Sequence, residues 1–492
     1  MPGLNASLYL GLTGLQTQQS ALNVVGHNIA NVNTPGYTRQ RADLSANQSL
    51  PEGQVFFGTG VTLDAVQGIR DRFLDLQIYR ETARQAGASE RYSGVNAVAS
   101  TLGDSGSTGI AAQVQAFFQG FQELSARPED GALRTNLVGK AQGMISALQT
   151  RYQLLEDQRD NADRSVSSLV TEVNTLTGQI AQLNQRITTE ATRSEDNDAR
   201  DQRKALTDKL STLVGIHVFE GSQGEYQITL DAGTAVLVSG NNAYALKTTS
   251  DPTLDNHLRV DSIMGGSVVN VTSAIQEGQL GAKLDLRDNI LPGFQRQLDE
   301  LAAGVAGRVN LLHRAGFAAD GATTGNDFFQ TGVANGANGL PVSVTAATNY
   351  KGMVSALAVN AGIVTNPSLI AAAGVAGAQG DNGTARQIAS LQSASGSVDT
   401  NGDGVGDTGP YSAFIASLVT DVGTKTQTYD AQNTTQQNLV AALQSQRDRI
   451  SGVDLDEEAT SMMALQRGYQ ASARFISVIN QLTDQLVNQF GR

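Results

Sequence analysis

Two repeating patterns of apolar residues, one near each end of the chain, predict long helices that pack against other helices. Near the amino terminus, apolar side chains recur in steps of three and four residues, and a longer series does the same within a predicted helix over 454–490. Fully burying such side chains releases about 1.5–3 kcal/mol each, so each series is expected to need a partner surface. The two seams consist of Leu4, Leu8, Leu15, Leu22, Val25 and Ile29, and of Met462, Leu465, Tyr469, Ile476, Ile479, Leu486 and Phe490.

Polar patterning separates these helices from ordinary exposed ones. Residues 1–38 contain no Lys, Arg, Asp or Glu, and residues 459–491 contain only Arg467, Arg474 and Asp484. A helix without a charged face is suited to packing among copies of itself. On pattern alone, the alternative that both are core helices of one globular domain stays open.

The start of the second seam helix carries four acidic residues. Asp454 is predicted to cap the helix while Glu457 reaches back to it, and Asp456 and Glu458 place negative charge at the positive end of the helix dipole. Adjacent side chains diverge on a helix, so Glu457 and Glu458 are not expected to act as a carboxylate pair.

Between the ends, helical and strand-like patterns alternate and predict a multidomain α+β fold. Long terminal and inner helices form a coiled-coil-like bundle into which central β-rich domains are inserted. The most regular heptad pattern covers residues 166–187, a short hairpin is expected within 55–66, and β-branched runs predict strands from residue 216. The expected units are a terminal assembly domain (1–38 plus 454–492), a helical domain (39–215 plus 280–315 plus 411–453), a small β domain (216–279) and a β-rich, Gly/Ala-rich insertion (316–410).

Composition excludes several classes of function. The 492 residues carry 34 basic and 47 acidic side chains, a net charge of −13 that disfavours nucleic-acid and anionic membrane partners. The chain has no cysteine, which rules out disulfides and thiolate metal sites. The amino-terminal stretch lacks the basic region of a cleaved signal peptide, and no run is apolar enough to span a bilayer.

One segment carries a candidate metal site. Asp399, Asn401 and Asp403, with Asp407 following, match the start of a calcium loop, but Pro410 stands where a bidentate Glu is expected. A weak calcium site and a plain surface turn both remain open, and the turn is favoured. No catalytic motif or cofactor site is found, so the chain is not expected to be an enzyme.

Two stretches resemble signatures of bacterial flagellar rod, hook and hook-associated proteins. Residues 466–471 are similar to the carboxy-terminal signature of that group, and residues 28–37 to its amino-terminal one. The amino-terminal resemblance rests on Asn31, Asn33, Thr34, Pro35, Gly36 and Tyr37.

Further stretches narrow the resemblance to the hook-associated protein 1 family, which forms the first junction between hook and filament. Residues 197–203 and 313–329 look like internal segments of that family, although Ala199 and Arg200 replace a usual apolar pair. The resemblance fades over about 330–410. The segment before the last helix is also similar, through Ser451, Gly452, Leu455, Asp456, Glu457 and Glu458.

The resemblance implies a structural subunit required for filament assembly and motility. Such proteins are exported through the flagellum's type III apparatus without a cleaved signal, and they lie outside the cell. Their termini are disordered in the monomer and fold on self-assembly. The implied partners are copies of the chain in a ring, the hook protein, a second hook–filament junction protein and an export chaperone at the carboxy-terminal helix.

Three alternatives differ in what they predict. Another flagellar axial subunit, of hook or rod, would lack the narrower resemblance. A secreted coiled-coil adhesin or calcium-binding surface protein would have ordered termini and a chelator-sensitive fold. An enzyme acting on the cell wall would depend on isolated carboxylates, and the sequence nominates none.

Overall fold

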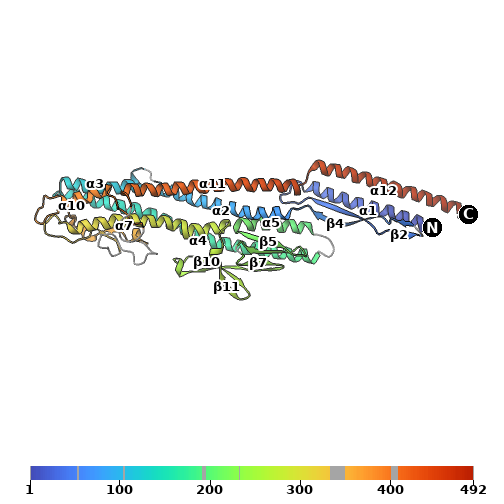
Figure 1. The fold of residues 1–492 in the computed structure, drawn as a ribbon, viewed down its shortest axis with the longest axis horizontal. Helices are drawn as coiled ribbons and strands as arrows, with labels where there is room; N and C mark the ends of the chain where they lie inside the picture. Colours follow the sequence, from blue (N-terminus) through green and yellow to red (C-terminus); the bar gives the residue numbers. More distant parts are fainter. Residues whose placement is uncertain are drawn as a thin grey trace.

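The computed structural model of the protein is a long rod built mainly from α-helices that follow one axis (Figure 1). It describes residues 2–52, 55–103, 106–190, 196–231, 233–332, 350–400 and 408–490. Both termini lie at one end, where α1 (Pro2–Ala30) packs against α12 (Leu455–Phe490). The fold class predicted from the sequence, helical with small β-sheets in the middle, is confirmed.

The shaft of the rod is a bundle around α4 (Gly131–Glu190), whose 60 residues span about 90 Å at 1.5 Å per residue. Its predicted heptad pattern is buried at Val166, Val173 and Ile180. A second long pair is formed by α2 (Arg72–Leu102) and α11 (Tyr411–Ser451). The remaining shaft helices are α3 (Ile110–Ala126), α5 (Asn197–Leu213), α6 (Gly278–Asp285) and α7 (Leu291–Ala315), with a π-helical turn at Leu286–Ile290 before α7.

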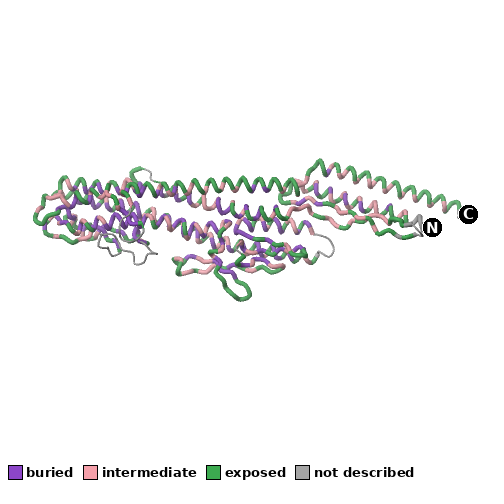
Figure 2. The backbone as a smooth tube through the Cα atoms, viewed as in Figure 1, coloured by how far each residue is buried: buried purple, intermediate pink, exposed green. Residues whose placement is uncertain are grey.

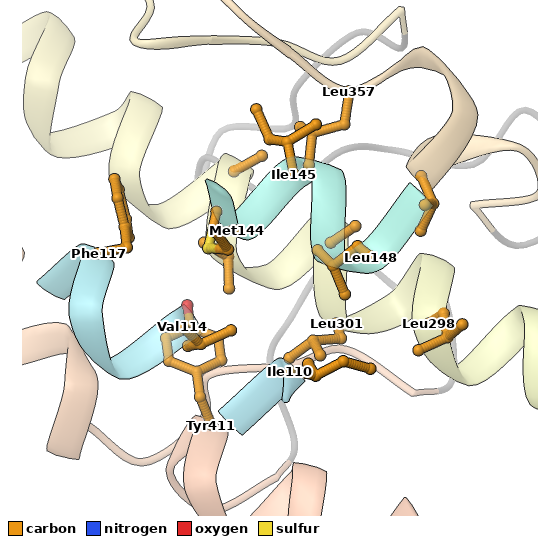
Figure 3. Close-up of a cluster of buried hydrophobic side chains, with 14 of the residues drawn as sticks. Ile110, Val114, Phe117, Met144, Ile145, Leu148, Leu298, Leu301, Leu357 and Tyr411 are labelled. Atoms are coloured by element: carbon orange, nitrogen blue, oxygen red, sulfur yellow. The ribbon is translucent and has the colours of Figure 1, made fainter. Parts of the chain in front are cut away.

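Burial is concentrated away from the termini. Purple, buried positions gather at the end of the rod opposite the termini, and α12 is coloured mainly as exposed (Figure 2). The larger core joins α3, α4, α7 and α11, and its side chains interdigitate in Figure 3. It includes a ring cluster in which Phe117 contacts Phe118, Phe121, Phe328 and Phe329. This end therefore holds most of the apolar burial that stabilises the monomer.

A small antiparallel β unit lies on α4 and α5. Four strands pair in the order β5 (Ile216–Glu220), β6 (Tyr226–Leu230), β7 (Val236–Ser239) and β8 (Asn242–Ala243). Three more pair in the order β11 (Ser267–Asn270), β10 (Leu258–Met264) and β9 (Leu246–Ser250). β6, β7 and β11 fall where β-branched runs predicted strands, whereas β10 lies in a stretch for which no strand was predicted.

Strands also follow α1, in a part of the chain assigned from sequence to a helical unit. We expected one hairpin within 55–66, but β3 (Val55–Phe57) pairs with β2 (Leu50–Glu52), and β4 (Val61–Gly68) pairs with β1 (Gln40–Ala46). Both β1 and β4 contact α1. The chain turns between β3 and β4 at Gly58–Gly60, and Gly60 has a φ of +113°, so the two strands join different partners.

The described part of the segment 316–410 has fewer strands than the β-rich expectation. Its described residues contain one pair of two-residue strands, β12 (Phe329–Gln330) with β13 (Ala358–Val359). They also form α8 (Met353–Ala356), α9 (Ala361–Thr365) and α10 (Gly383–Ser390). Gly and Ala offer a sheet little side-chain surface, whereas Asn side chains cap short turns: Asn360 accepts from Gly362 N–H at 2.9 Å. The strand-like residues 342–344 lie outside the described ranges.

Candidate assembly site at the paired termini

Glycines set how closely the two terminal helices approach. A Cβ atom on Gly11 would lie 2.7 Å from Ile476 Cγ1, and one on Gly468 would lie 3.0 Å from Gln18 Cδ. These contacts join early residues of α1 to late residues of α12, so the helices are antiparallel. The small residues allow a close helix pair in which the apolar seams face each other.

The predicted seam of α12 is the face turned toward α1, but its burial is incomplete. Met462, Leu465, Tyr469, Ile476, Ile479 and Leu486 are each half-buried, and from residue 459 to 489 no side chain of α12 is fully buried. In α1, Val25 is buried and Leu8, Leu15, Leu22 and Ile29 are half-buried. The side chains of Leu4 and Phe490 are outside the described part of the structure. The pair thus covers the two seams only partly, and α12 is covered on one side only.

A second apolar stripe remains exposed on both helices, although Phe475 lies at its edge beside Gly11 of α1. These exposed residues are Tyr9, Leu10 and Leu12 on α1, and Met463, Phe475, Val478, Leu482 and Val487 on α12. Contiguous exposed apolar surface marks an interaction site in a soluble protein. Over the described ranges, no helix has the length and apolar character required to cross a membrane.

Asn28, at the end of α1, holds the chain as it leaves the helix. It is 1% exposed, and its Nδ2 donates to Gln40 O at 2.8 Å and to Glu458 Oε2 at 3.1 Å. Its Oδ1 accepts from Gln40 N at 2.9 Å and from the Tyr37 hydroxyl at 2.8 Å. Burial raises the pKa of Tyr37, and Asp201 raises it further, so the phenol keeps the proton that it donates. One amide thus fastens α1, β1 and α12 together.

Arg39 joins the start of β1 to the start of α12. Its Nε donates to Glu458 Oε1 at 2.7 Å and its Nη1 to Glu457 Oε2 at 2.6 Å. Its backbone N–H donates to Ser451 O at 2.8 Å. Burial by itself would lower the pKa of Arg39, but the hydrogen bonds to the two glutamates outweigh it and raise the pKa. Glu458 is 2% exposed, so this ion pair is largely removed from water.

The start of α12 agrees only in part with the expected capping. Asp454 Oδ1 accepts from Asp456 N–H at 2.8 Å, as predicted. Glu457 is bonded to Arg39 rather than reaching back to Asp454. The expectation that Glu457 and Glu458 do not act as a pair was wrong, because both carboxylates accept from Arg39, which lies 418 and 419 residues away in the sequence.

The internal segment in α5 reaches the same place. Asp201 accepts from Thr38 N at 2.9 Å, from Thr38 Oγ1 at 2.6 Å and from Arg70 Nη2 at 2.8 Å. Burial raises the pKa of Asp201, against the opposing effects of Arg70 and Thr38. Asn197 Nδ2 donates to Val66 O at 2.7 Å. The shaft is therefore tied to the segment that follows α1.

Three stretches that resemblance singled out separately thus meet at one point, which we call the terminal hub: residues 28–40, 197–203 and 451–458. A pocket of about 420 Å³ lies at the hub, and Gly36 turns the chain beside it with a φ of +80°. Leu455 and Asp456 are exposed at its edge. The predicted motif residues that line the pocket are Asn31, Asn33, Thr34, Pro35, Gly36, Tyr37, Ser451 and Gly452.

Residues 313–329, the other internal stretch that resembles the family, hold the end of α7 in the larger core, at the end of the rod opposite the termini. His313 Nε2 accepts from Ala371 N–H at 2.9 Å, which leaves Nδ1 to donate to Asn326 O at 2.7 Å. Arg314 Nε pairs with Asp327 Oδ1 at 2.6 Å. Burial lowers the pKa of His313 to about 4, so the ring is neutral near pH 7.

The calcium-loop candidate is only partly described. Asn401, Asp403 and Asp407 lie outside the described residues. Asp399 is buried and accepts a hydrogen bond from the Tyr350 hydroxyl, so this carboxylate has a partner within the protein. Among the described residues, no three His, Asp or Glu side chains are grouped as a metal site requires.

The paired ends and their motifs define the class of protein. A family model described as flagella basal body rod protein matches residues 8–38, and one for the carboxy-terminal part of basal body rod proteins FlgEFG matches residues 444–489. Both segments meet at the terminal hub and extend into α1 and α12. The fold and the site are those of flagellar axial proteins.

Comparison of the whole chain narrows the class. The model "Flagellar hook-associated protein FlgK helical domain" matches residues 95–329. Flagellar hook-associated protein 1 of Escherichia coli K12 is 30% identical over 97% of this chain and 98% of its own length. The Bacillus subtilis 168 protein of the same name is 27% identical over 99% of each chain. The chain belongs to the flagellar hook-associated protein 1 family, a family of structural proteins of the flagellum.

A solved structure has the same fold. The flagellar hook junction protein FlgK from Burkholderia pseudomallei superposes with a TM-score of 0.65 at 18% identity, covering 76% of this chain and all of that one. The similarity between the folds extends beyond the helical domain that the family model matches.

Proposed function

We propose that this chain is a structural subunit of the bacterial flagellum that forms the junction between hook and filament, and that filament assembly and motility depend on it. The observation that carries the proposal is similarity to hook-associated protein 1 over nearly the whole of both chains. A hook or rod subunit would match at the ends alone.

The second part of the proposal is that assembly of subunits orders the two terminal helices. We propose that α1 and α12 are disordered in the free subunit and fold when neighbouring subunits cover them. The half-buried seam of α12 and its exposed stripe support this, since burying apolar area is the main favourable term in helix packing. Polymerisation would supply the missing partner surface, and the unit formed by 1–38 and 454–492 would act as the assembly domain.

Partners and location follow from the same proposal. The subunit would contact its own copies in a ring, the hook protein on one side and a second junction protein on the other. An export chaperone would hold the carboxy-terminal helix beforehand, covering the stripe that includes Phe475 and Val478. The chain would reach the cell exterior through the type III export apparatus without cleavage of a signal peptide.

The test compares the full chain with a truncation lacking 1–40 and 454–492, using circular dichroism and limited proteolysis. We expect protease to trim the full chain to a stable core and the truncation to lose almost no helix. Protected ends, with a truncation that unfolds, would contradict the assembly role of the termini. Complementation of a strain without its own hook-associated protein 1 tests the junction itself, and absence of filaments would contradict it.

A further inference from the structure

A second pocket lies beside the terminal hub, between the start of α2, α5 and the small β unit. Its volume is about 660 Å³, within the roughly 300–1,000 Å³ range of sites that enclose small ligands. Such a space accommodates a few side chains of a protein segment. Phe73, Leu76, Tyr79, Val218 and Phe219 provide its apolar lining.

The rim of this pocket exposes large apolar side chains. Phe73 is 87% exposed and Phe219 is 60% exposed, and Leu76 is exposed beside them. Two aromatic rings and a leucine around one hollow form a patch rather than scattered surface residues. Clustered aromatic anchors of this kind mark protein–protein contacts.

Charge at the pocket favours an acidic partner. Arg70, Arg72 and Arg200 line it with two carboxylates, Asp75 and Glu220. The side chain of Arg72 is 73% exposed although it pairs with Glu220 at 3.0 Å, so it remains accessible to a second carboxylate. This local excess of positive charge contrasts with the net charge of −13 for the chain.

The chain itself carries a segment of matching chemistry. Leu455, the first residue of α12, is 50% exposed, and its neighbours Asp454 and Asp456 are exposed as well. An apolar side chain between two carboxylates complements an apolar pocket rimmed by arginines. The segment projects where α11 gives way to α12 (Figure 1).

The segment around Leu455 and the pocket between α2, α5 and β5 lie at similar positions along the rod axis, but on different sides of the rod. The hub pocket, which Val453 lines, shares Arg70 and Asp75 with the second pocket, so the two are adjacent along the long axis. In Figure 1 the start of α12 is at the upper edge of the rod, and β5 lies on the lower side, just below α5. Copies placed side by side could therefore bring one feature against the other.

We propose that Leu455 of one subunit, flanked by Asp454 and Asp456, docks into the pocket formed by α2, α5 and β5 of the next copy. This contact rests on the proposed function, and it adds a subunit interface outside the terminal helices. It is heterologous, because two different surfaces meet, and a heterologous contact closes a ring when the rotation is right. Each copy would then couple the ordering of its hub to the shaft of its neighbour.

Disulfide trapping tests the contact directly, because the chain has no cysteine of its own. Cells would produce two single variants together, Leu455→Cys with Phe219→Cys, and isolated hook–filament junctions would be oxidised and resolved without reductant. The matched control replaces Phe219→Cys by Val268→Cys, at an equally exposed residue of β11. Disulfides require Cβ atoms about 3.5–4.5 Å apart, so trapping reports contact.

We expect Leu455→Cys and Phe219→Cys to yield heterodimers at least tenfold above the control pair. Adding Phe73→Asp to the Phe219→Cys chain should lower the yield, since a carboxylate at the rim repels Asp454 and Asp456. Junctions that contain both variants but give no excess over the control would overturn the contact and leave the proposed function standing. Junctions that lack even the unmodified chain would overturn the proposed function, and this contact with it.

Discussion

Replacing Glu458 by Gln would test the terminal hub most sharply. Glu458 is 2% exposed and accepts from two donors, Arg39 Nε at 2.7 Å and Asn28 Nδ2 at 3.1 Å. Glutamine has almost the same shape, but it carries no charge and has one acceptor oxygen. Glu457 offers a matched control, because it binds the same arginine with a side chain that is 62% exposed.

The structure gives different magnitudes for the two substitutions. Glu458→Gln loses one of two charged hydrogen bonds in a nearly water-free position, which costs about 2 kcal/mol, within the range of about 1.5–3 for bonds to charged groups. The 22% exposure of the Arg39 side chain keeps the value from being larger. Glu457→Gln breaks an exposed ion pair, worth about 0.5 kcal/mol. Both substitutions remove one negative charge, so net charge does not separate them.

Competition for places in the junction is the assay. Each variant would be produced together with the parent chain, and peptide mass spectrometry would compare their ratio in isolated junctions with their ratio in the cell. At about 1.4 kcal/mol per factor of ten, Glu458→Gln should be depleted about 30-fold and Glu457→Gln about twofold. Equal incorporation of both variants would refute the view that the hub orders the termini.

Three further predictions address other parts of the molecule. Ile476→Asp with Ile479→Asp should abolish incorporation and chaperone binding while the thermal unfolding of the central domains stays unchanged; continued junction assembly would contradict the seam. Gly11→Ala places a Cβ 2.7 Å from Ile476 Cγ1 and should weaken incorporation by about 1 kcal/mol or more. Gly26→Ala is the control in the same competition assay: Gly26 has open space around it, so the substitution should be neutral or mildly stabilising. The pKa of His313 is about 4 in the fold, against 6.5 ordinarily, so the unfolded chain binds the proton first as the pH falls. The free energy of unfolding should therefore decrease between about pH 6.5 and pH 4, by up to about 3 kcal/mol. Unfolding curves of the His313→Gln variant, measured over the same pH range, should lack this decrease.

Local patterns in the sequence determined much of the secondary structure. Heptad spacing identified the long helices and the face of α12 that meets α1. Apolar residues at helical spacing lie on one face of a helix, and they mark the packed face whichever partner covers it. Strands β6, β7 and β11 and the cap at Asp454 also follow from local residue types. Patterning was less informative over the described part of 316–410, where Gly and Ala favour neither period and Asn side chains cap short helices.

Only the tertiary structure decided which distant residues meet. Asn28 and Glu458 are 430 residues apart, and Thr38 and Asp201 are 163 apart, so no periodicity links them. Resemblance marked each stretch of the hub separately, yet the pairing of Arg39 with two adjacent glutamates appears only when β1 is laid beside the start of α12. The same holds for the pocket around Phe73 and Phe219, whose walls come from separate elements. Hydrogen bonds and ion pairs depend on the positions of both partners, and a sequence specifies a residue's type before the fold specifies its neighbours.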